Sequence, residues 1–270
     1  MTAGEPRPGL IEDMRPGRIR EIVDGISAVF VPVSPRYEWH ALHLPVGCDG
    51  LIAEEVARLL AERLDAAWFR CLSLGLDQWR SDDFKRQNGL PVRRQVFGMN
   101  FPKLFLKSEY IDLNPFRAVV AARLDAIRGT GFRCAFIVNH HGGEGQDETL
   151  RQLAAAFTEG EFRVEVLRPF AFNTYEPPEE QRMQLRVGGH AGLAETVQLL
   201  AFRPDLVDLS QIPDGPLRAA EQGILHREPV IPAEWNPRRA LRSVADACRR
   251  SVLDNLEAHV RKVVSAPLTP

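Results

Sequence analysis

The chain has 270 residues, with 34 basic and 36 acidic side chains and a formal net charge of −2. Such a balance leaves no excess positive field to hold a polyanion, so we expect no nucleic acid partner. No apolar run approaches the roughly 18 residues of a membrane span, and residues 1–18 lack the order of a secretory signal. We therefore expect a soluble, cytoplasmic protein without a membrane partner. Its length favours one domain over 1–270, with 1–18 as a polar N-terminal extension.

Predicted strands and helices alternate along the chain. Short β-branched runs predict strands buried on both faces, and apolar residues three and four positions apart predict helices. In chain order we expect a strand at 26–33, helices at 51–64 and 114–128, a strand at 132–138, a helix at 147–157, a strand at 162–167 and a helix at 238–264. This alternation predicts an α/β fold with a mostly parallel sheet flanked by helices on both faces.

The four cysteines are scattered along the chain. Cys48, Cys71, Cys134 and Cys248 form no Cys-x-x-Cys pair, and three of them lie in apolar or helix-like stretches. Free cysteine is among the most buried residue types. We therefore expect buried thiols, in preference to disulfides or a zinc–thiolate site.

The first polar loop follows the strand that ends near Val33, where a ligand of a parallel sheet is expected to bind. It contains two carboxylates and two imidazoles, those of Glu38, His40, His43 and Asp49. Oxygen and nitrogen donors without a thiolate suit Zn²⁺, Mn²⁺ or Fe²⁺, and a carboxylate can bridge two ions. The alternative is a solvated loop with histidines held by hydrogen bonds.

Two further histidine segments follow later in the chain. His140 and His141 come directly after a predicted strand and before two glycines. Adjacent side chains on an extended strand point to opposite sides, so at most one of the two is expected to be a ligand. His190 and Glu195 flank a predicted helix start. The three segments together hold five of the seven histidines, which favours a common site.

The three segments resemble, in order, the motifs of the creatininase family over residues 29–200. That family has Glu-x-His-Gly-x-His-Leu-Pro-x-x-x-Asp, then Asn-x-His-Gly-Gly-Asn, then His-Ala-Gly-x-x-Glu-Thr, and this chain has similar residues at 38–49, 139–144 and 190–196. The resemblance implies a creatininase-like three-layer sandwich and two divalent ions, Zn²⁺ and/or Mn²⁺ with Fe²⁺ as an alternative. Members are often hexamers, so it also implies a homo-oligomer.

The same resemblance implies roles for single residues. Asp49 would bridge the two ions, with Glu38 and His141 on one and His40 on the other. His190 is similar to the acid/base histidine of the family. Because a strand end presents successive side chains to opposite sides, replacing His140 should leave the metal in place.

The last ligand of the second ion is left open by the resemblance. Glu195 would complete or support that shell, and with His190 it is a candidate catalytic residue. Creatininase itself has a glutamate ligand where this chain has Gly143, and Glu144 stands where asparagine is usual. Glu144 could therefore be a ligand or could orient His141.

Other side chains are candidates for substrate contact or for a supporting role. His43 and Trp79 belong to this group, as do Trp39 and Arg80. For each of the two tryptophans and for the arginine, surface packing is the alternative.

The activity that the resemblance implies is hydrolysis of a small-molecule substrate. Two adjacent cations lower the pKa of a shared water and polarise a carbonyl group. The first expectation is cleavage of a C–N bond in a small, cyclic amide. Two alternatives stay open, namely C–C bond hydrolysis of a cyclic polyol diketone of the inosose type, and a non-catalytic binding protein.

Overall fold

A four-stranded parallel sheet forms the centre of the fold. The computed structural model describes residues 9–186 and 189–267, and the strands occur in the order β2-β1-β3-β4. Their bounds are β1 Ala28–Pro32, β2 Ala67–Trp68, β3 Cys134–Val138 and β4 Arg163–Leu167. Each neighbouring pair is parallel. The predicted parallel sheet is confirmed.

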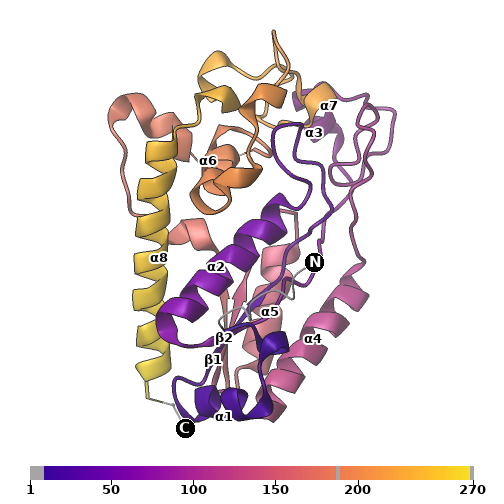
Figure 1. Cartoon of the computed structure of the whole chain (residues 1–270). Helices are drawn as coiled ribbons and strands as arrows, with labels where there is room; N and C mark the ends of the chain where they lie inside the picture. The colour runs from indigo at the N-terminus through magenta and orange to yellow at the C-terminus, as the bar shows by residue number, and fades with distance from the viewer. Residues whose placement is uncertain (1–8, 187–188, 268–270) are drawn as a thin grey trace, which may run out of the picture.

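Helices cover both faces of this sheet (Figure 1). One face packs against α2 Cys48–Leu64, α6 Leu193–Phe202 and α8 Arg242–Ser265. The other face packs against α1 Pro16–Asp24, α4 Leu113–Thr130 and α5 Gln146–Phe157. The predicted three-layer arrangement is therefore confirmed.

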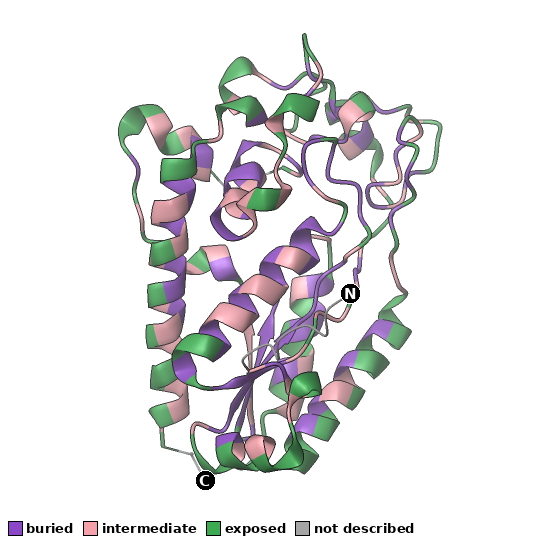
Figure 2. Cartoon of the chain, in the orientation of Figure 1, coloured by how far each residue is buried: buried purple, intermediate pink, exposed green. Residues whose placement is uncertain are grey.

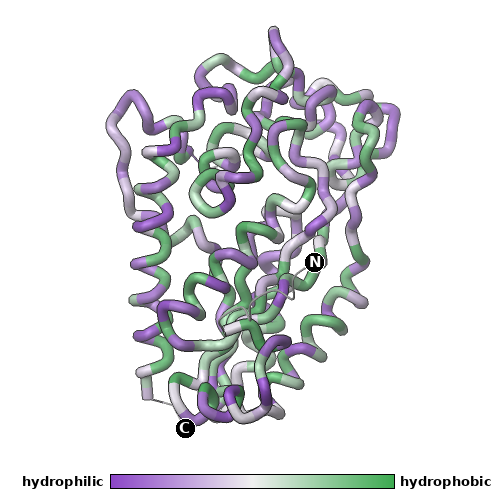
Figure 3. Tube along the Cα trace, viewed as in Figure 1, coloured by the Kyte–Doolittle hydropathy of each residue, from purple (hydrophilic) through white to green (hydrophobic). Residues whose placement is uncertain are grey.

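The alternation of side chains along β1 explains why both faces need a cover. Ala28 and Phe30 join the core beneath α2 and α8, whereas Val29 and Val31 join the core beneath α4. All five residues of β1 are buried, and the strands lie inside a shell of half-buried and exposed helix faces (Figure 2). Apolar residues line the centre and polar residues the outside (Figure 3). Burial on both faces is what an uninterrupted apolar strand predicts.

Short elements and loops cover the end of the sheet where the strands terminate (Figure 1). The segment between β2 and α4 contains α3 Asp82–Gln87, and the segment between α6 and α8 contains α7 Ala219–Gln222. The 3-10 helices are η1 Ile11–Asp13, η2 Pro169–Phe172, η3 Glu179–Leu185, η4 Pro204–Leu206, η5 Leu209–Gln211, η6 Ala233–Trp235 and η7 Pro237–Arg239. Among the helices of the described residues, none combines the length and apolar character needed to cross a membrane.

Two helix starts differ from the sequence prediction. Helix α2 begins at Cys48, three residues before the predicted start at Leu51, so Asp49 lies in its first turn and not in a loop. Helix α8 begins at Arg242 and not at 238, because a 3-10 turn occupies Pro237–Arg239. Helix α4 ends at Thr130, two residues beyond the predicted end at 128, and Gly131 follows it with a φ of 99°, which glycine adopts without strain.

The first described residues pack against the rest of the domain. Leu10 is fully buried and pairs with Trp68, and α1 begins at Pro16. Residues 1–8 of the expected N-terminal extension lie outside the described residues.

Candidate metal centre

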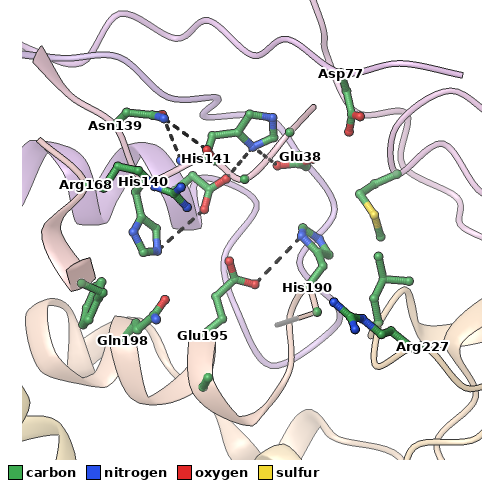
Figure 4. Close-up of a pocket in the computed structure, with 18 of the residues that line it drawn as sticks. Glu38, Asp77, Asn139, His140, His141, Arg168, His190, Glu195, Gln198 and Arg227 are labelled. Carbon is green, nitrogen blue, oxygen red and sulfur yellow. Dashed lines mark hydrogen bonds and ion pairs between the residues drawn. The ribbon is translucent and has the colours of Figure 1, made fainter. Parts of the chain in front are cut away.

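Four segments bring ligand-type side chains together at the carboxyl edge of the sheet (Figure 4). They are the loop after β1, the first turn of α2, the loop after β3, and the loop and first turn at α6. A cavity of ≈ 570 Å³ opens onto them. The side chains at this point are Glu38, His40, Asp49, His140, His141, His190 and Glu195.

Asp49 presents its two oxygens to two different sets of partners. Oδ2 lies 2.9 Å from Nδ1 of His141, and that nitrogen lies 3.4 Å from Oε2 of Glu38. Oδ1 lies 3.7 Å from Nε2 of His40 and 4.0 Å from Nε2 of His140. Glu195 joins the second set, with Oε1 4.0 Å from Nε2 of His40. One carboxylate thus lies between two groups of potential ligands.

Hydrogen bonds to backbone carbonyls fix which ring nitrogen of each histidine faces the carboxylates. Nδ1 of His40 donates to the carbonyl oxygen of Glu38 at 3.2 Å, and Nε2 of His141 donates to that of Leu76 at 3.0 Å. Because a carbonyl oxygen only accepts, these nitrogens carry protons. The opposite nitrogens of both rings therefore face Asp49, which is the arrangement of a metal-binding histidine.

Unpaired polar atoms converge on the same point. Within residues 9–186 and 189–267, six buried side-chain oxygens and nitrogens lack a hydrogen-bond partner, and four of them are here. The four are Oε2 of Glu38, Nε2 of His40, Oδ1 of Asp49 and Nε2 of His140. Buried polar atoms are normally paired, and ions bound at this point would supply the missing partners.

The spacing of these atoms suits a transition-metal ion. Ligands about 2.1 Å from a tetrahedral ion lie roughly 3.4 Å from each other, and the separations around Asp49 run from 2.9 to 4.0 Å. Carboxylate and imidazole donors suit Zn²⁺ and Mn²⁺. The residues present therefore fit a divalent metal.

The charges at this point depend strongly on one another. Burial alone would raise the pKa of Glu38, but the nearby imidazoles, His141 first, lower it to about 2. Burial alone would lower the pKa of His40, but Asp49, Glu195 and Glu38 raise it to about 10. The buried carboxylates therefore need positive charge beside them, and a divalent cation can supply it.

The folded chain holds the carboxylates at helix starts. Asp49 lies in the first turn of α2 and Glu195 in the first turn of α6. The positive end of a helix dipole stabilises a negative charge there. Oε2 of Glu195 also accepts a hydrogen bond from the backbone N–H of Ala191.

Amide side chains shape the loop after β3. Oδ1 of Asn139 accepts from the backbone N–H of His141 at 3.1 Å, and Gln146 donates to the same oxygen at 3.0 Å. Gln146 also accepts from the backbone N–H of Leu76 at 2.8 Å. These contacts fix Leu76, whose carbonyl oxygen in turn orients His141.

The structure places both adjacent histidines beside Asp49, although at most one of them was expected to be a ligand. Strand β3 ends at Val138, and the loop beyond it no longer alternates its side chains. His141 reaches Oδ2 of Asp49 and His140 approaches Oδ1.

Three sequence candidates lie away from the cluster. His43 is buried, and its Nε2 donates at 2.9 Å to the hydroxyl of Thr196, which itself donates to the carbonyl oxygen of Gly192. Glu144 is exposed and accepts a hydrogen bond from Gln78. Trp79 is 60% exposed and packs edge-on against Phe97. None of these three candidates is among the described residues that line the cavity.

Position 143 has no room for a side chain. A Cβ atom there would lie 2.0 Å from Nε2 of His141 and 2.2 Å from the carbonyl oxygen of Leu76. A glutamate ligand at this position is therefore excluded by the fold of this chain. Gly188, two residues before His190 in the sequence, lies outside the described residues.

Sequence reasoning suggested that the loop at 77–83 could line a pocket, but it assigned several residues of the cluster no role there. Asp77 lies with Glu38 and His141 in a set of possible ligand atoms that are all within 4.8 Å of one another. The hydroxyl of Tyr110 donates to Oε1 of Glu38. Cys48 lies near His40 and Glu195, and burial, reinforced by the carboxylates, raises the pKa of its thiol well above the usual value. No sequence motif marks Asp77 or Tyr110, because both belong to the irregular segment between β2 and α4.

The remaining cavity wall carries positive and polar groups. Arg168 lies beside His140, and Arg227 lies on the other side of the cluster, beyond His190 (Figure 4). Arg80 also lines the cavity, but it is held by Asp77 at 2.7 Å. Nε of Arg168 lies 3.9 Å from Oδ1 of Asp147.

Comparisons with known proteins agree with this fold. The chain is similar to a solved structure of creatinine amidohydrolase (creatininase), with 19% identity, a TM-score of 0.67, and coverage of 97% of this chain and 100% of the other. A structure described as creatininase Mn has 20% identity, a TM-score of 0.66, and coverage of 96% and 99%. A creatininase mutant complexed with creatine has 21% identity, a TM-score of 0.65, and coverage of 96% and 99%.

The sequence comparisons give a family. No curated protein sequence matches this chain. The family model described as creatinine amidohydrolase matches residues 12–247, which include every side chain of the cluster around Asp49. The chain therefore belongs to the creatininase family.

Proposed function

We propose that this chain is a divalent-metal-dependent hydrolase that cleaves a C–N bond in a small amide. Two ions would be held by Glu38, His40, Asp49, His141 and Glu195. The observation that carries the proposal is the position of Asp49, which offers one oxygen to each of two imidazole–carboxylate sets. Membership of the creatininase family supports the amidohydrolase class. Structures of creatininase in an Mn form and a Zn–Zn form support the choice of metals.

Bound divalent ions at this point would polarise a carbonyl group and lower the pKa of a water molecule. The protein would supply the remaining groups. Nε2 of His190 donates to the carbonyl oxygen of Trp39 at 2.5 Å, so its proton is fixed there. Nδ1 faces Glu195 at 4.0 Å, where it can accept a proton and pass it to a leaving nitrogen.

The cavity supports a small, polar substrate. Arg168, Arg227 and Gln198 surround the cluster and suit a ligand with a carboxylate or several oxygens. One of the similar structures is complexed with creatine, which is a small carboxylic acid. A cyclic amide that carries a carboxylate is therefore the first candidate substrate.

The proposal is tested by metal analysis together with a substrate panel. Metal content is measured by mass spectrometry before and after dialysis against a chelator. Turnover is then measured with lactams, linear amides and cyclic polyol diketones, each with and without a carboxylate. We expect amine release that stops on metal removal and returns on reloading.

Other results would change the proposal. Cleavage of a diketone without amine release would favour the C–C alternative. Bound metal without turnover of any compound would favour a binding protein. A fully active protein that contains no divalent metal would refute the proposal.

The cytoplasmic location and the homo-oligomer stay predictions from the sequence and the family resemblance. Light scattering coupled to size-exclusion chromatography measures the oligomeric state directly. A hexamer should elute with six times the mass of the 30.3 kDa chain.

A further inference from the structure

His140 holds a position at the cluster that the proposed ligand set leaves unexplained. Its ring lies 5.3 Å from the ring of Phe170, and its backbone N–H donates to the hydroxyl of Ser34 at 3.0 Å. Both contacts hold the residue at the exit of β3. These contacts therefore define the position of His140 in the loop.

Nε2 of His140 points at an oxygen that is also unpaired. It lies 4.0 Å from Oδ1 of Asp49, and neither atom has a hydrogen-bond partner. Asp49, His140 and Glu195 each offer one ligand-type atom, and these three atoms all lie within 4.8 Å of one another. A histidine that served only to pack against Phe170 would not need its buried nitrogen turned to a carboxylate. A buried nitrogen without a partner lowers the stability of the folded protein, and a bound ion would remove this desolvation penalty.

We propose that His140 is a direct ligand, through Nε2, of the ion that Asp49, His40 and Glu195 surround. This inference rests on the proposed metal-dependent function and assigns the ligand that was left open for the second ion. It reverses the expectation that replacing His140 leaves the metal in place. The two neighbouring histidines then serve different ions, His141 on the Oδ2 side of Asp49 and His140 on the Oδ1 side.

The steric limit at Gly143 supports this assignment. Since no side chain fits at position 143, the loop after β3 cannot supply a second ligand from there. His140 belongs to the same loop and reaches the other side of Asp49. The adjacent residues His140 and His141 would therefore each supply an imidazole to a different ion.

The test measures metal binding and not turnover. Crystals of the zinc-loaded protein, recorded at the zinc absorption edge, should show an ion about 2.0–2.1 Å from Nε2 of His140. This measurement uses the unaltered chain. It remains decisive even if a variant fails to fold.

A variant pair gives an independent measurement. His140→Phe keeps a ring against Phe170 but removes the nitrogen donor. Loss of a supporting partner typically weakens metal affinity 10- to 100-fold, so loss of a direct ligand should weaken the second ion by at least about 100-fold. His226→Phe is the matched control, because His226 stacks on Trp235 at 3.9 Å and does not line the cavity among the described residues. Competition with a chelator measures both affinities.

The outcomes separate this inference from the proposed function. Two bound ions with Nε2 of His140 outside bonding distance would overturn the inference and leave the function standing. An unchanged affinity for both ions in a folded His140→Phe protein would do the same. An unaltered chain that binds no ion would overturn both.

Discussion

Gly143 lies so close to His141 that a Cβ atom at position 143 would be 2.0 Å from Nε2 of the imidazole. That nitrogen donates to the carbonyl oxygen of Leu76, and this hydrogen bond orients the ring. The two bonded atoms occupy the space that a side chain at position 143 would need. The orientation of one ligand therefore depends on a glycine two residues later.

Replacing this glycine should disturb the metal centre. In Gly143→Ala the methyl group must displace the ring of His141 or the backbone of Leu76, and strain of this kind costs about 1–3 kcal/mol. We expect lower metal content and a lower free energy of unfolding, measured by mass spectrometry and denaturant titration. Gly142→Ala is the control, because a Cβ atom there meets nothing within 4 Å. Equal metal content and an equal free energy of unfolding in the two variants would show that the contact with His141 affects neither quantity.

Asp49 should be the most sensitive single ligand. Asp49→Asn keeps the shape of the side chain but removes the charge that both imidazole sets face. Because a bridging group serves both ions, we expect both to be lost together, measured as metal content against zinc concentration. The control is Asp205→Asn, which alters an acid paired with Arg203 at the surface. If the Asp49→Asn protein keeps two ions and full turnover, Asp49 does not bridge them.

The sequence predicted those parts of the molecule that have a period or a motif. The apolar spacing located β1, β3 and β4 and the helices α2, α4, α5 and α8, because burial on a fixed face imposes a repeat. Strand β2 has only two residues, Ala67 and Trp68, and two residues cannot show a period. The start of α2 was missed because its N-cap, Gly47, makes no side-chain capping bond.

The site was predictable where histidines and carboxylates cluster in sequence, but not where the fold brings in distant segments. Glu38, His40 and Asp49 stand close together in the chain. Asp77 and Tyr110 reach Glu38 only through the irregular segment before α4, in which no pattern indicates the path of the backbone. His140 was set aside by a rule that holds within strands, and the strand ends two residues before it.

Arg227 should affect substrate binding more than the chemical step. It lines the cavity beyond His190, apart from the carboxylate cluster (Figure 4). A hydrogen bond to a charged group is worth about 1.5–3 kcal/mol, so Arg227→Ala should raise KM roughly 10- to 100-fold for a carboxylate-bearing substrate with little change in kcat. The same substrate without its carboxylate is the control, and its KM should rise much less in the Arg227→Ala protein. A fall in kcat with an unchanged KM would contradict this role.

All four thiols should be unreactive in the folded protein. Burial raises the pKa of Cys71 and of Cys248 to about 12, and it also raises the pKa of Cys48 and Cys134. Because the thiolate is the reactive form, iodoacetamide at pH 8 should modify none of them within minutes. In denaturant all four should react, which peptide mass spectrometry can count. Rapid modification of any thiol in the native protein would contradict these raised pKa values.

His190 should support proton transfer and not metal retention. The carboxylates and the other imidazoles can fill both ion positions without it, and its Nδ1 faces Glu195 at the cavity wall. His190→Ala should therefore keep two ions and lower kcat by roughly 10²–10⁴-fold, the usual effect of removing a general acid or base. His226→Ala, which removes an imidazole outside the cavity lining, should leave the metal content and kcat unchanged. A metal-depleted His190→Ala protein whose activity returns with excess Zn²⁺ or Mn²⁺ would instead identify His190 as a ligand, in agreement with its position within 4.8 Å of atoms of Glu38 and His40.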